Sequence, residues 1–323
     1  MDLREGTLIT EEVRLLKPLP TAGSARVWLA DQLDWRKKVV VKVLSGMKAK
    51  DDDTLARFLE SAAQAQELES EHVARLFDFG VTDDFTPYVV MDRLKGESLA
   101  ARLKRTERLE PRDVGEVVSQ VAQALGSAHE MGLLHLGIEP DGIFLCEGKG
   151  TTNVKVLGFG TACLRPIDRS NEYASPELYL GKKPDHRADL WSLGAVTYRS
   201  LTGQVPIDAN KRRLMQWNFD PPSEMWLADV PAEVDEWFER ALNKLRDMRF
   251  DSAEEMASAL SDLIPGLEHL VSRGKELEAG GMVIPVVEVG GPASARPRKS
   301  EHDLVVQEMT EDGPGITVDV DND

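Results

Sequence analysis

The sequence predicts an α+β protein with a strand-rich first lobe, a helix-rich second lobe and an acidic tail. Short β-branched runs are concentrated in the first ninety residues. After Gly96 apolar residues recur with helical spacing instead. Residues 279–300 are rich in Gly, Pro and small residues, and 301–323 contain eight acidic side chains and no Lys or Arg. These three observations predict two packed lobes followed by a flexible segment.

The first lobe is expected to consist of strands with one inserted helix. Residues 13–30 alternate in character and Val39–Leu44 is a β-branched run, with a turn predicted at Asp31–Asp34. Further strands are predicted at Leu76-Phe77 and Pro87–Met91. Residues 52–69 have helical spacing, with one face formed by Leu55, Phe58, Leu59, Ala62, Ala63 and Ala65.

The second lobe is expected to be mostly helical. Helical periodicity covers 99–103 and 114–131, and Gly132 is a plausible helix stop. The second helix has an apolar stripe formed by Val114, Val117, Val118, Val121, Leu125 and Ala128. Short strands at Ile143–Leu145 and Val154–Leu157 are followed by helices over 188–202, 232–243 and 252–263.

Composition excludes several classes of function. Of 323 residues, 41% are hydrophobic, which is enough for a core, and 39 basic against 56 acidic residues give a net charge of −17. This charge argues against binding to nucleic acid or to anionic membranes. Cys146 and Cys163 cannot form a disulfide framework and have no metal-ligand spacing around them. Without a signal peptide or an apolar run long enough to span a membrane, the chain is expected to be cytoplasmic.

Several strings resemble protein kinase motifs, and they follow one another in the kinase order. Val39-Val40-Val41-Lys42 resembles V-A-I-K, and the stretch from Pro87 to Leu99 resembles a hinge. The remaining strings are His135–Leu145 for the catalytic loop, Val156–Gly160 for D-F-G, Tyr173–Glu177 for Y-x-A-P-E, Asp185–Gly194 and Arg249-Phe250. The chain is therefore identified as resembling the bacterial Hanks-type (eukaryotic-like) Ser/Thr protein kinases. The resemblance implies a bilobal kinase-like fold.

The resemblance also suggests domain boundaries. We expect an N-terminal extension over 1–9 and a kinase-like domain over 10–264. Within this domain the N-lobe covers 10–94 and the C-lobe 95–264. Residues 265–323 are expected to be a linker and a largely disordered acidic tail.

The catalytic positions of the family are altered in this sequence. The catalytic-loop Asp falls on Gly137, the metal-binding Asn on Gly142 and the D-F-G Asp on Gly158, while the catalytic-loop Lys falls on Glu139. Phosphoryl transfer depends on positioning and on electrostatic stabilisation, and magnesium requires oxygen ligands. These substitutions predict a catalytically degenerate member, a pseudokinase that is not an enzyme, has no magnesium site and is unlikely to bind ATP.

The nucleotide pocket is expected to be vestigial. Lys42 is retained, but the phosphate loop carries Pro20, Ala22 and Ala25 at the glycine positions. The partner of Lys42 would fall on Ser61, with Glu60 one residue away unless the alignment shifts. Val40 and Phe144 are larger than the usual residues, which predicts either a partly filled adenine site or ordinary core variation. The pocket positions are Val27, Val40, Lys42, Met91, Asp92, Leu94 and Phe144.

The residues that hold the family fold are present. His135 and Phe159 would belong to an internal stack completed by Ala65 and Leu76, and Asp189 would cap the catalytic-loop backbone. Glu177 and Arg249 match a buried ion pair of the family. The sequence thus retains structural residues and lacks catalytic ones.

Three functions follow from this pattern. The first is a protein-binding scaffold or allosteric regulator in Ser/Thr kinase signalling, with a protein partner such as an active kinase. The second is a nucleotide sensor that needs no metal, and the third is a weakly active or unusual transferase. The tail is either a solvating acidic end or a docking segment, in which Thr310 and Thr317 are candidate phosphorylation sites.

Overall fold

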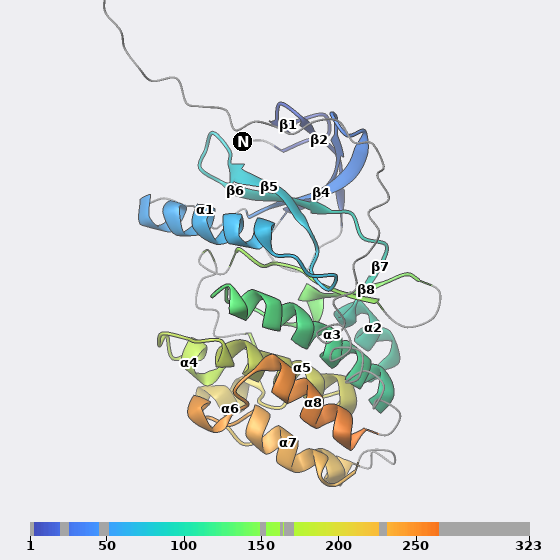
Figure 1. The fold of residues 1–323 in the computed structure, drawn as a ribbon, viewed down its shortest axis with the longest axis vertical. Coiled ribbons are helices and arrows are strands. Elements are labelled where there is room, and N and C mark those ends of the chain that lie inside the picture. Colours follow the sequence, from blue (N-terminus) through green and yellow to red (C-terminus); the bar gives the residue numbers. More distant parts are fainter. Residues whose placement is uncertain are drawn as a thin grey trace, which may run out of the picture. The chain divides into compact units, whose positions relative to one another are not determined.

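The computed structural model describes residues 3–19, 26–44, 52–148, 153–161, 164, 171–225 and 231–264. They form an N-terminal lobe of strands with one helix and a C-terminal lobe of helices (Figure 1). The N-lobe elements are β1 (Leu8–Thr10), β2 (Val13–Leu19), β3 (Arg26–Gln32), β4 (Lys37–Val43), α1 (Asp52–Glu67), β5 (Leu76–Val81) and β6 (Pro87–Asp92). The α+β bilobal prediction is confirmed.

The six N-lobe strands form one antiparallel sheet in the order β1-β2-β3-β4-β6-β5. Side chains alternate between the two faces of a sheet, so each face has its own apolar set. One face packs on a cluster that includes Trp28, Val39, Val41 and Val90. The other face contributes Val89 and Met91 to a cluster with Phe58 and Ala62 of α1. The inserted helix therefore covers one face of the sheet, the face that carries Lys42.

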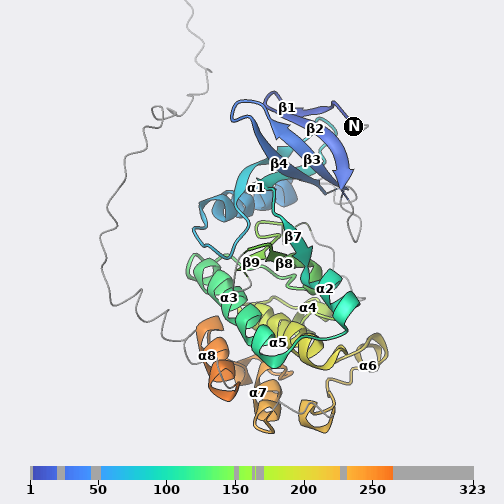
Figure 2. The ribbon, with the colours of Figure 1, turned by 90° about the vertical axis from the view of Figure 1, so that its right-hand side faces the viewer.

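The C-lobe is built around α3 and α5. Its elements are β7 (Gly96–Ser98), α2 (Leu99–Thr106), α3 (Pro111–Glu130), η1 (Pro140–Gly142), β8 (Ile143–Cys146), β9 (Asn153–Val156), α4 (Pro176–Tyr179), α5 (Arg187–Thr202), α6 (Ala209–Arg213), η3 (Pro222–Met225), α7 (Val234–Ala241), η4 (Arg246–Met248) and α8 (Ala253–Leu263). All six residues of the predicted α3 stripe are buried, and α5 is buried nearly all round. Figure 2 shows β8 and β9 beside the sheet-facing side of this helical lobe.

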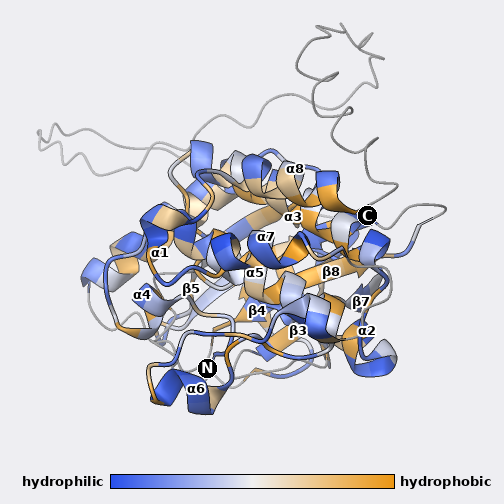
Figure 3. Cartoon of the chain, turned by 90° about the horizontal axis from the view of Figure 1, so that it is seen from below, coloured by the Kyte–Doolittle hydropathy of each residue, from blue (hydrophilic) through white to orange (hydrophobic). Residues whose placement is uncertain are grey.

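The outer helices of the C-lobe are amphipathic. In α7 the residues Val234, Trp237, Phe238 and Ala241 are buried, which is the spacing of one helical face. Figure 3 shows hydrophobic and hydrophilic residues side by side along α7 and α8. Ser252 caps α8 by accepting a hydrogen bond from the backbone N–H of Glu255 at 3.0 Å. These caps and faces fix α7 and α8 against α3 and α5.

Several elements differ from the expectation. β1 begins at Leu8, within the expected N-terminal extension, because it pairs with β2. β3 continues to Gln32, so the turn to β4 lies at residues 33–36 rather than at Asp31–Asp34. Leu59 was predicted on the apolar face of α1 but is 36% exposed. The short elements β7, α4 and α6 have too few residues for a periodic signal.

Two further predictions concern the two cysteines and membrane-spanning helices. Cys146 is a half-buried free thiol, and Cys163 lies outside the described residues. Within the described ranges no helix combines the length and the apolar character that crossing a bilayer requires.

Candidate functional site

The catalytic loop is held by one buried carboxylate. Asp189, near the start of α5, is fully buried. Its Oδ2 accepts a hydrogen bond from the backbone N–H of His135 at 2.9 Å, and its Oδ1 accepts one from Leu136 at 2.6 Å. His129 of α3 places Nε2 3.0 Å from Oδ2. A carboxylate that receives two backbone amides fixes the path of the chain at this point.

The backbone at the start of the loop is strained. Leu136 has a φ of +53°, in the left-handed region that residues with a Cβ rarely adopt. The hydrogen bonds that the backbone N–H groups of His135 and Leu136 donate to Asp189 hold this conformation. The His135 ring lies edge-on to Phe159 with centroids 4.7 Å apart, and its Nε2 is 3.0 Å from the carbonyl oxygen of Leu157. The catalytic loop and the strand before Gly158 are thus tied together.

The four positions that the sequence predicts to be altered catalytic positions surround this junction. Gly137 is buried, Glu139 is half-buried, and the amide of Asn171 donates a hydrogen bond to Glu139 Oε2 at 3.4 Å. Gly142 ends η1, and its backbone N–H donates to the carbonyl of Glu139 at 2.9 Å. Gly158 has a φ of +104°, which favours glycine. At the positions where the family carries side chains for chemistry, this chain therefore offers backbone groups and one carboxylate.

The sheet gathers most of the predicted nucleotide-facing residues on one face. Val27 of β3 is directly opposite Lys42 of β4, and Val40 is opposite Met91 of β6. Residues opposite one another in an antiparallel pair share a face, as do residues two apart along one strand. Val27, Val40, Lys42 and Met91 therefore point to the same side, toward α1 and the C-lobe.

A small apolar cavity of about 20 Å³ lies under Lys42. Lys42 lines it together with Gly158, Phe159, Ala65 and Leu76. This set contains three of the four residues predicted for the internal stack, and the fourth, His135, contacts Phe159. Lys42 on β4 thus lines the same cavity as Gly158, which follows β9.

The other predicted pocket residues come from the link between the lobes. Asp92 ends β6 and forms an ion pair with Lys37 at 3.6 Å. Leu94 follows at a half-buried position, and Phe144 on β8 pairs in register with Ser98 and Lys155. The predicted phosphate-loop residues Pro20, Ala22 and Ala25 lie outside the described residues.

α1 packs directly on the turn at Gly160, which follows Phe159. Gly160 has a φ of +78°, and a Cβ added there would lie 2.9 Å from both Ala62 Cα and Ala65 Cβ and 3.0 Å from the carbonyl of Ser61. The backbone carbonyl of Ser61 therefore lies close to Gly160, and Ser61 is half-buried. Glu60 is exposed, as expected for a residue about 100° away around a helix.

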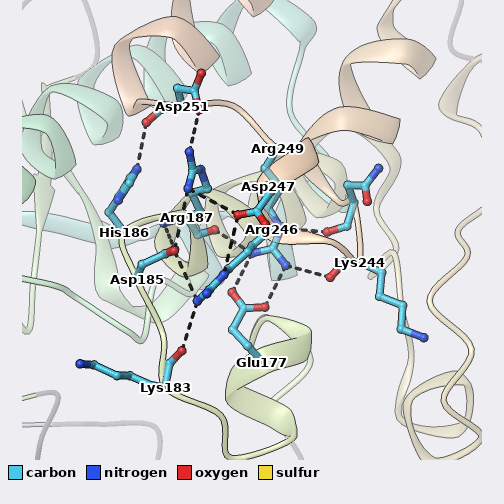
Figure 4. Close-up of polar contacts among 11 residues, drawn as sticks. Glu177, Lys183, Asp185, His186, Arg187, Lys244, Arg246, Asp247, Arg249 and Asp251 are labelled. Carbon is cyan, nitrogen blue, oxygen red and sulfur yellow. Dashed lines mark hydrogen bonds and ion pairs between the residues drawn. The ribbon is translucent and has the colours of Figure 1, made fainter.

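A second anchor lies below the catalytic loop and was also predicted from the sequence. Arg249 is almost fully buried and forms a bidentate pair with Glu177, with Nη1–Oε1 2.7 Å and Nη2–Oε2 2.8 Å (Figure 4). Burial tends to raise the pKa of Glu177, but the hydrogen bonds and charge of Arg249 outweigh it and lower the pKa below the ordinary value. Arg249 also donates to the carbonyls of Asn243 and Arg187.

A network of half-buried and exposed charges surrounds this pair. Arg187 contacts Asp251 at 2.7 Å and lies 3.9 Å from both Asp185 and Asp247. Arg246 reaches Asp185 at 3.5 Å (Figure 4). Sequence reasoning missed this network, because the spacing of its members along the chain has no pattern.

Comparison with known proteins decides the family. The model of the protein kinase domain family matches residues 17–270. This chain belongs to the protein kinase domain family. It is 31% identical to the serine/threonine-protein kinase Pkn1 of Myxococcus xanthus over 84% of its length, and 30% identical to PknA of Mycobacterium tuberculosis over 82%. The kinase domain of PknI of Mycobacterium tuberculosis superposes with a TM-score of 0.69 at 25% identity, covering 81% of this chain and 99% of that domain.

These relatives are longer than the matched region. The alignment covers 40% of Pkn1 and 64% of PknA. The comparisons therefore describe the kinase domain, and they support the prediction of a Hanks-type family member with bacterial Ser/Thr kinase homologues.

Two sequence-based predictions are wrong against these findings. The chain was expected not to be an enzyme and to bind neither ATP nor magnesium, whereas its relatives are named serine/threonine-protein kinases, members of a family that uses ATP with magnesium. The prediction rested on side chains at four motif positions and on the residues of the phosphate loop and the adenine site. Backbone amides also bind phosphates in proteins, and magnesium takes water, phosphate and carbonyl oxygens as ligands.

The described residues can be tested against a magnesium ion directly. Within those ranges no three His, Cys, Asp or Glu side chains gather in a group that could hold a metal. Gly137, Gly142 and Gly158 offer only backbone carbonyls. The side chains present do not by themselves form a magnesium site, so we derive no catalytic step through the ion.

Proposed function

We propose that this chain acts in Ser/Thr kinase signalling as a protein-binding regulator, either as a scaffold or as an allosteric partner of another signalling protein. The observation that supports the proposal is a contrast within one site. Buried charged groups at Asp189 and at Glu177–Arg249 hold the backbone of the catalytic loop and of α4. The positions that would contact a transferred phosphate are Gly137, Gly142, Gly158 and Glu139.

Such an arrangement is suited to presenting a fixed surface to a polypeptide. The hydrogen bonds of Asp189 and the bidentate pair of Arg249 restrict the backbone without requiring a bound ligand. A rigid surface reduces the entropy lost when a partner binds. The regulator would therefore act through contacts made by the C-lobe.

The test is reconstitution with a partner found by crosslinking in the source cells. With purified proteins, we expect saturable binding and a change of about fivefold or more in the activity of the partner, the lower range of ordinary coupling between sites. Lys42→Met should leave this effect unchanged, because Lys42 faces the cavity between the lobes. Binding without any change in the activity of the partner would favour a scaffold over an allosteric regulator. Absence of binding would overturn the proposal.

A second candidate function is an ATP-dependent transferase with slow turnover. It is favoured by the named activity of the relatives and by the position of Lys42 beside Gly158. Incubation of the full chain with radiolabelled ATP and Mg²⁺ or Mn²⁺ should then label the chain or a generic protein substrate. Loss of the label in Lys42→Met would support this candidate, and equal labelling in both would point to a contaminating kinase.

A melting experiment distinguishes nucleotide sensing without turnover from ATP-dependent transfer. A rise in the melting temperature with ATP that persists in EDTA indicates binding that needs no metal. A rise that requires Mg²⁺ favours the transferase.

A further inference from the structure

The C-terminal ends of α2 and α5 line a polar cavity on the C-lobe. Its volume is about 510 Å³, and sites for small molecules span roughly 300–1,000 Å³. Its lining includes three cations, one carboxylate and two further polar side chains: Lys104, Arg108, Arg199, Glu107, Thr202 and Gln204. Among the described residues, none of the positions predicted for catalysis or for the nucleotide pocket lines it, so it is a separate site.

The charge of this lining is opposite in sign to the charge of the whole chain. The lining has a net charge of +2, whereas the chain has a net charge of −17. Within the part of the chain that the structure describes, no carboxylate lies within 4.0 Å of Lys104, Arg108 or Arg199. Arg105, by contrast, forms an ion pair with Glu97 at 2.7 Å. A cavity lined mainly by one sign of charge concentrates ions of the other sign, which here are anions.

Arg199 is a fixed donor at the wall of the cavity. Its side chain is half-buried, and Nη1 donates to the carbonyl oxygen of Glu107 at 2.7 Å. Glu107 has a φ of +66°, a strained conformation for a residue with a Cβ, and the backbone N–H of Leu109 donates to the carbonyl of Ser200 at 2.8 Å. A guanidinium has five N–H donors, and with the described residues Arg199 uses one of them. The remaining donors are available to a ligand.

Helix dipoles account for two of the three cations. Lys104 and Arg199 lie in the last turns of α2 and α5, where positive charge is favourable. Arg108 lies beyond the C-cap residue Glu107 and donates no hydrogen bond to a residue that the structure describes. Two guanidinium groups and one ammonium group at one polar cavity are the donors that proteins use to bind phosphate.

We propose that this cavity binds a small molecule that carries phosphate groups, with Lys104, Arg108 and Arg199 donating to the phosphate oxygens. The exposed amide of Gln204 offers a donor and an acceptor to the uncharged part of such a ligand. The site is distinct from the cavity that Lys42 lines, and the inference is independent of the proposed protein-binding function.

Inorganic pyrophosphate is the probe for this site, titrated into the full chain at constant ionic strength. We expect a saturable rise in the melting temperature, together with slower hydrogen–deuterium exchange in peptides covering 103–108 and 199–204. Arg108→Gln should weaken binding about tenfold, because it removes charge-assisted hydrogen bonds to the anion and breaks no contact with a described residue. Arg199→Gln should weaken binding at least as much. It also removes the hydrogen bond to Glu107, so Arg108→Gln decides the test if Arg199→Gln does not fold.

Two control variants locate the bound anion. Arg14→Gln makes the same change of net charge at an exposed position on β2 and should bind pyrophosphate like the wild type. Lys42→Met should also bind normally, because Lys42 lines the other cavity. Equal weakening in Arg14→Gln and Arg108→Gln would indicate attraction to the overall charge, and loss of binding in Lys42→Met alone would place the anion beside Lys42. Either result, or no saturable binding to the wild type, would overturn the inference.

Discussion

The anchors of the C-lobe and the catalytic positions that they hold make an instructive contrast. Asp189 and Arg249 are buried and engaged in several short hydrogen bonds each. Gly137, Gly142 and Gly158 have no side chains, and Glu139 stands where we predict the lysine of the family motif to fall. Groups that fix a backbone and groups that contact a substrate are thus separate residues in this fold. The residues that contact a substrate can change while the residues that fix the backbone are retained. Four substitutions test how far the two groups of residues are independent.

The largest effect is expected from breaking the Glu177–Arg249 pair. Glu177→Gln leaves a buried guanidinium without its counter-charge, and removing one partner of such a pair lowers the free energy of unfolding by about 3–5 kcal/mol. Chemical denaturation measures this change. The matched control Asp31→Asn, in the exposed pair with Lys38, should lower it by about 0.2–1 kcal/mol. Equal losses would show that burial does not distinguish the two pairs.

The same pair predicts a dependence on pH. The pKa of Glu177 is lowered in the folded protein. Its contribution to the free energy of unfolding is therefore complete above the ordinary glutamate pKa of 4.5, and it is lost as the pH falls through the lower pKa of the folded state. Acid unfolding of the wild type should therefore be steeper in this range than that of Glu177→Gln. Identical unfolding profiles against pH for the wild type and Glu177→Gln would contradict the lowered pKa of Glu177.

Asp189→Asn should have the next largest effect. An amide NH₂ in place of one oxygen leaves a buried backbone N–H of the catalytic loop without an acceptor, which lowers the free energy of unfolding by about 1–3 kcal/mol for each group affected. Hydrogen exchange at 135–137 should rise together with this loss. Asp113→Asn, at an exposed position in the first turn of α3, serves as the control and should change stability by less than about 1 kcal/mol.

Gly160→Ala tests how closely α1 packs on the turn at Gly160. The new Cβ would meet Ala62 and Ala65 at 2.9 Å, and overpacking of this kind costs about 1–3 kcal/mol in addition to backbone strain. Gly132→Ala is matched to it, with a φ of +73° and nothing within 4 Å of an added Cβ. The difference between the two melting temperatures isolates the steric contribution, and no difference would place α1 farther away than described.

The smallest effect on stability is expected from restoring a motif side chain. An added Cβ at Gly142 would lie 3.5 Å from the carbonyl of Leu157, an ordinary contact, so Gly142→Asn should change the free energy of unfolding by less than about 1 kcal/mol. Thermal melting with and without Mg²⁺ and ATP then shows whether the asparagine strengthens nucleotide binding. A large destabilisation would mean that the glycine is needed for the fold.

The order of the elements followed from local patterns. β4 was predicted within one or two residues at each end, because a short β-branched run has few alternatives. All six stripe residues of α3 are buried because a 3.6-residue period places them on one face. The pairs Glu177–Arg249 and Asp189–catalytic loop could be named in advance only through the resemblance, since nothing local links residues so far apart in the chain. The same resemblance, applied residue by residue, led to the incorrect exclusion of enzyme activity and ATP.

The sequence by itself determined the family and the two lobes, since both are properties of residue types in order. Only the tertiary structure decided that the backbone of α1 at Ser61 and Ala62 lies against Gly160, and that Lys42 lines the same cavity as Phe159. Arg212 shows the limit most clearly: its sequence surroundings are charged and typical of a surface helix, yet its side chain is enclosed. Two of the three carbonyls that it binds, those of Glu172 and Ala174, are about forty positions away in the chain, and only packing brings them to Arg212.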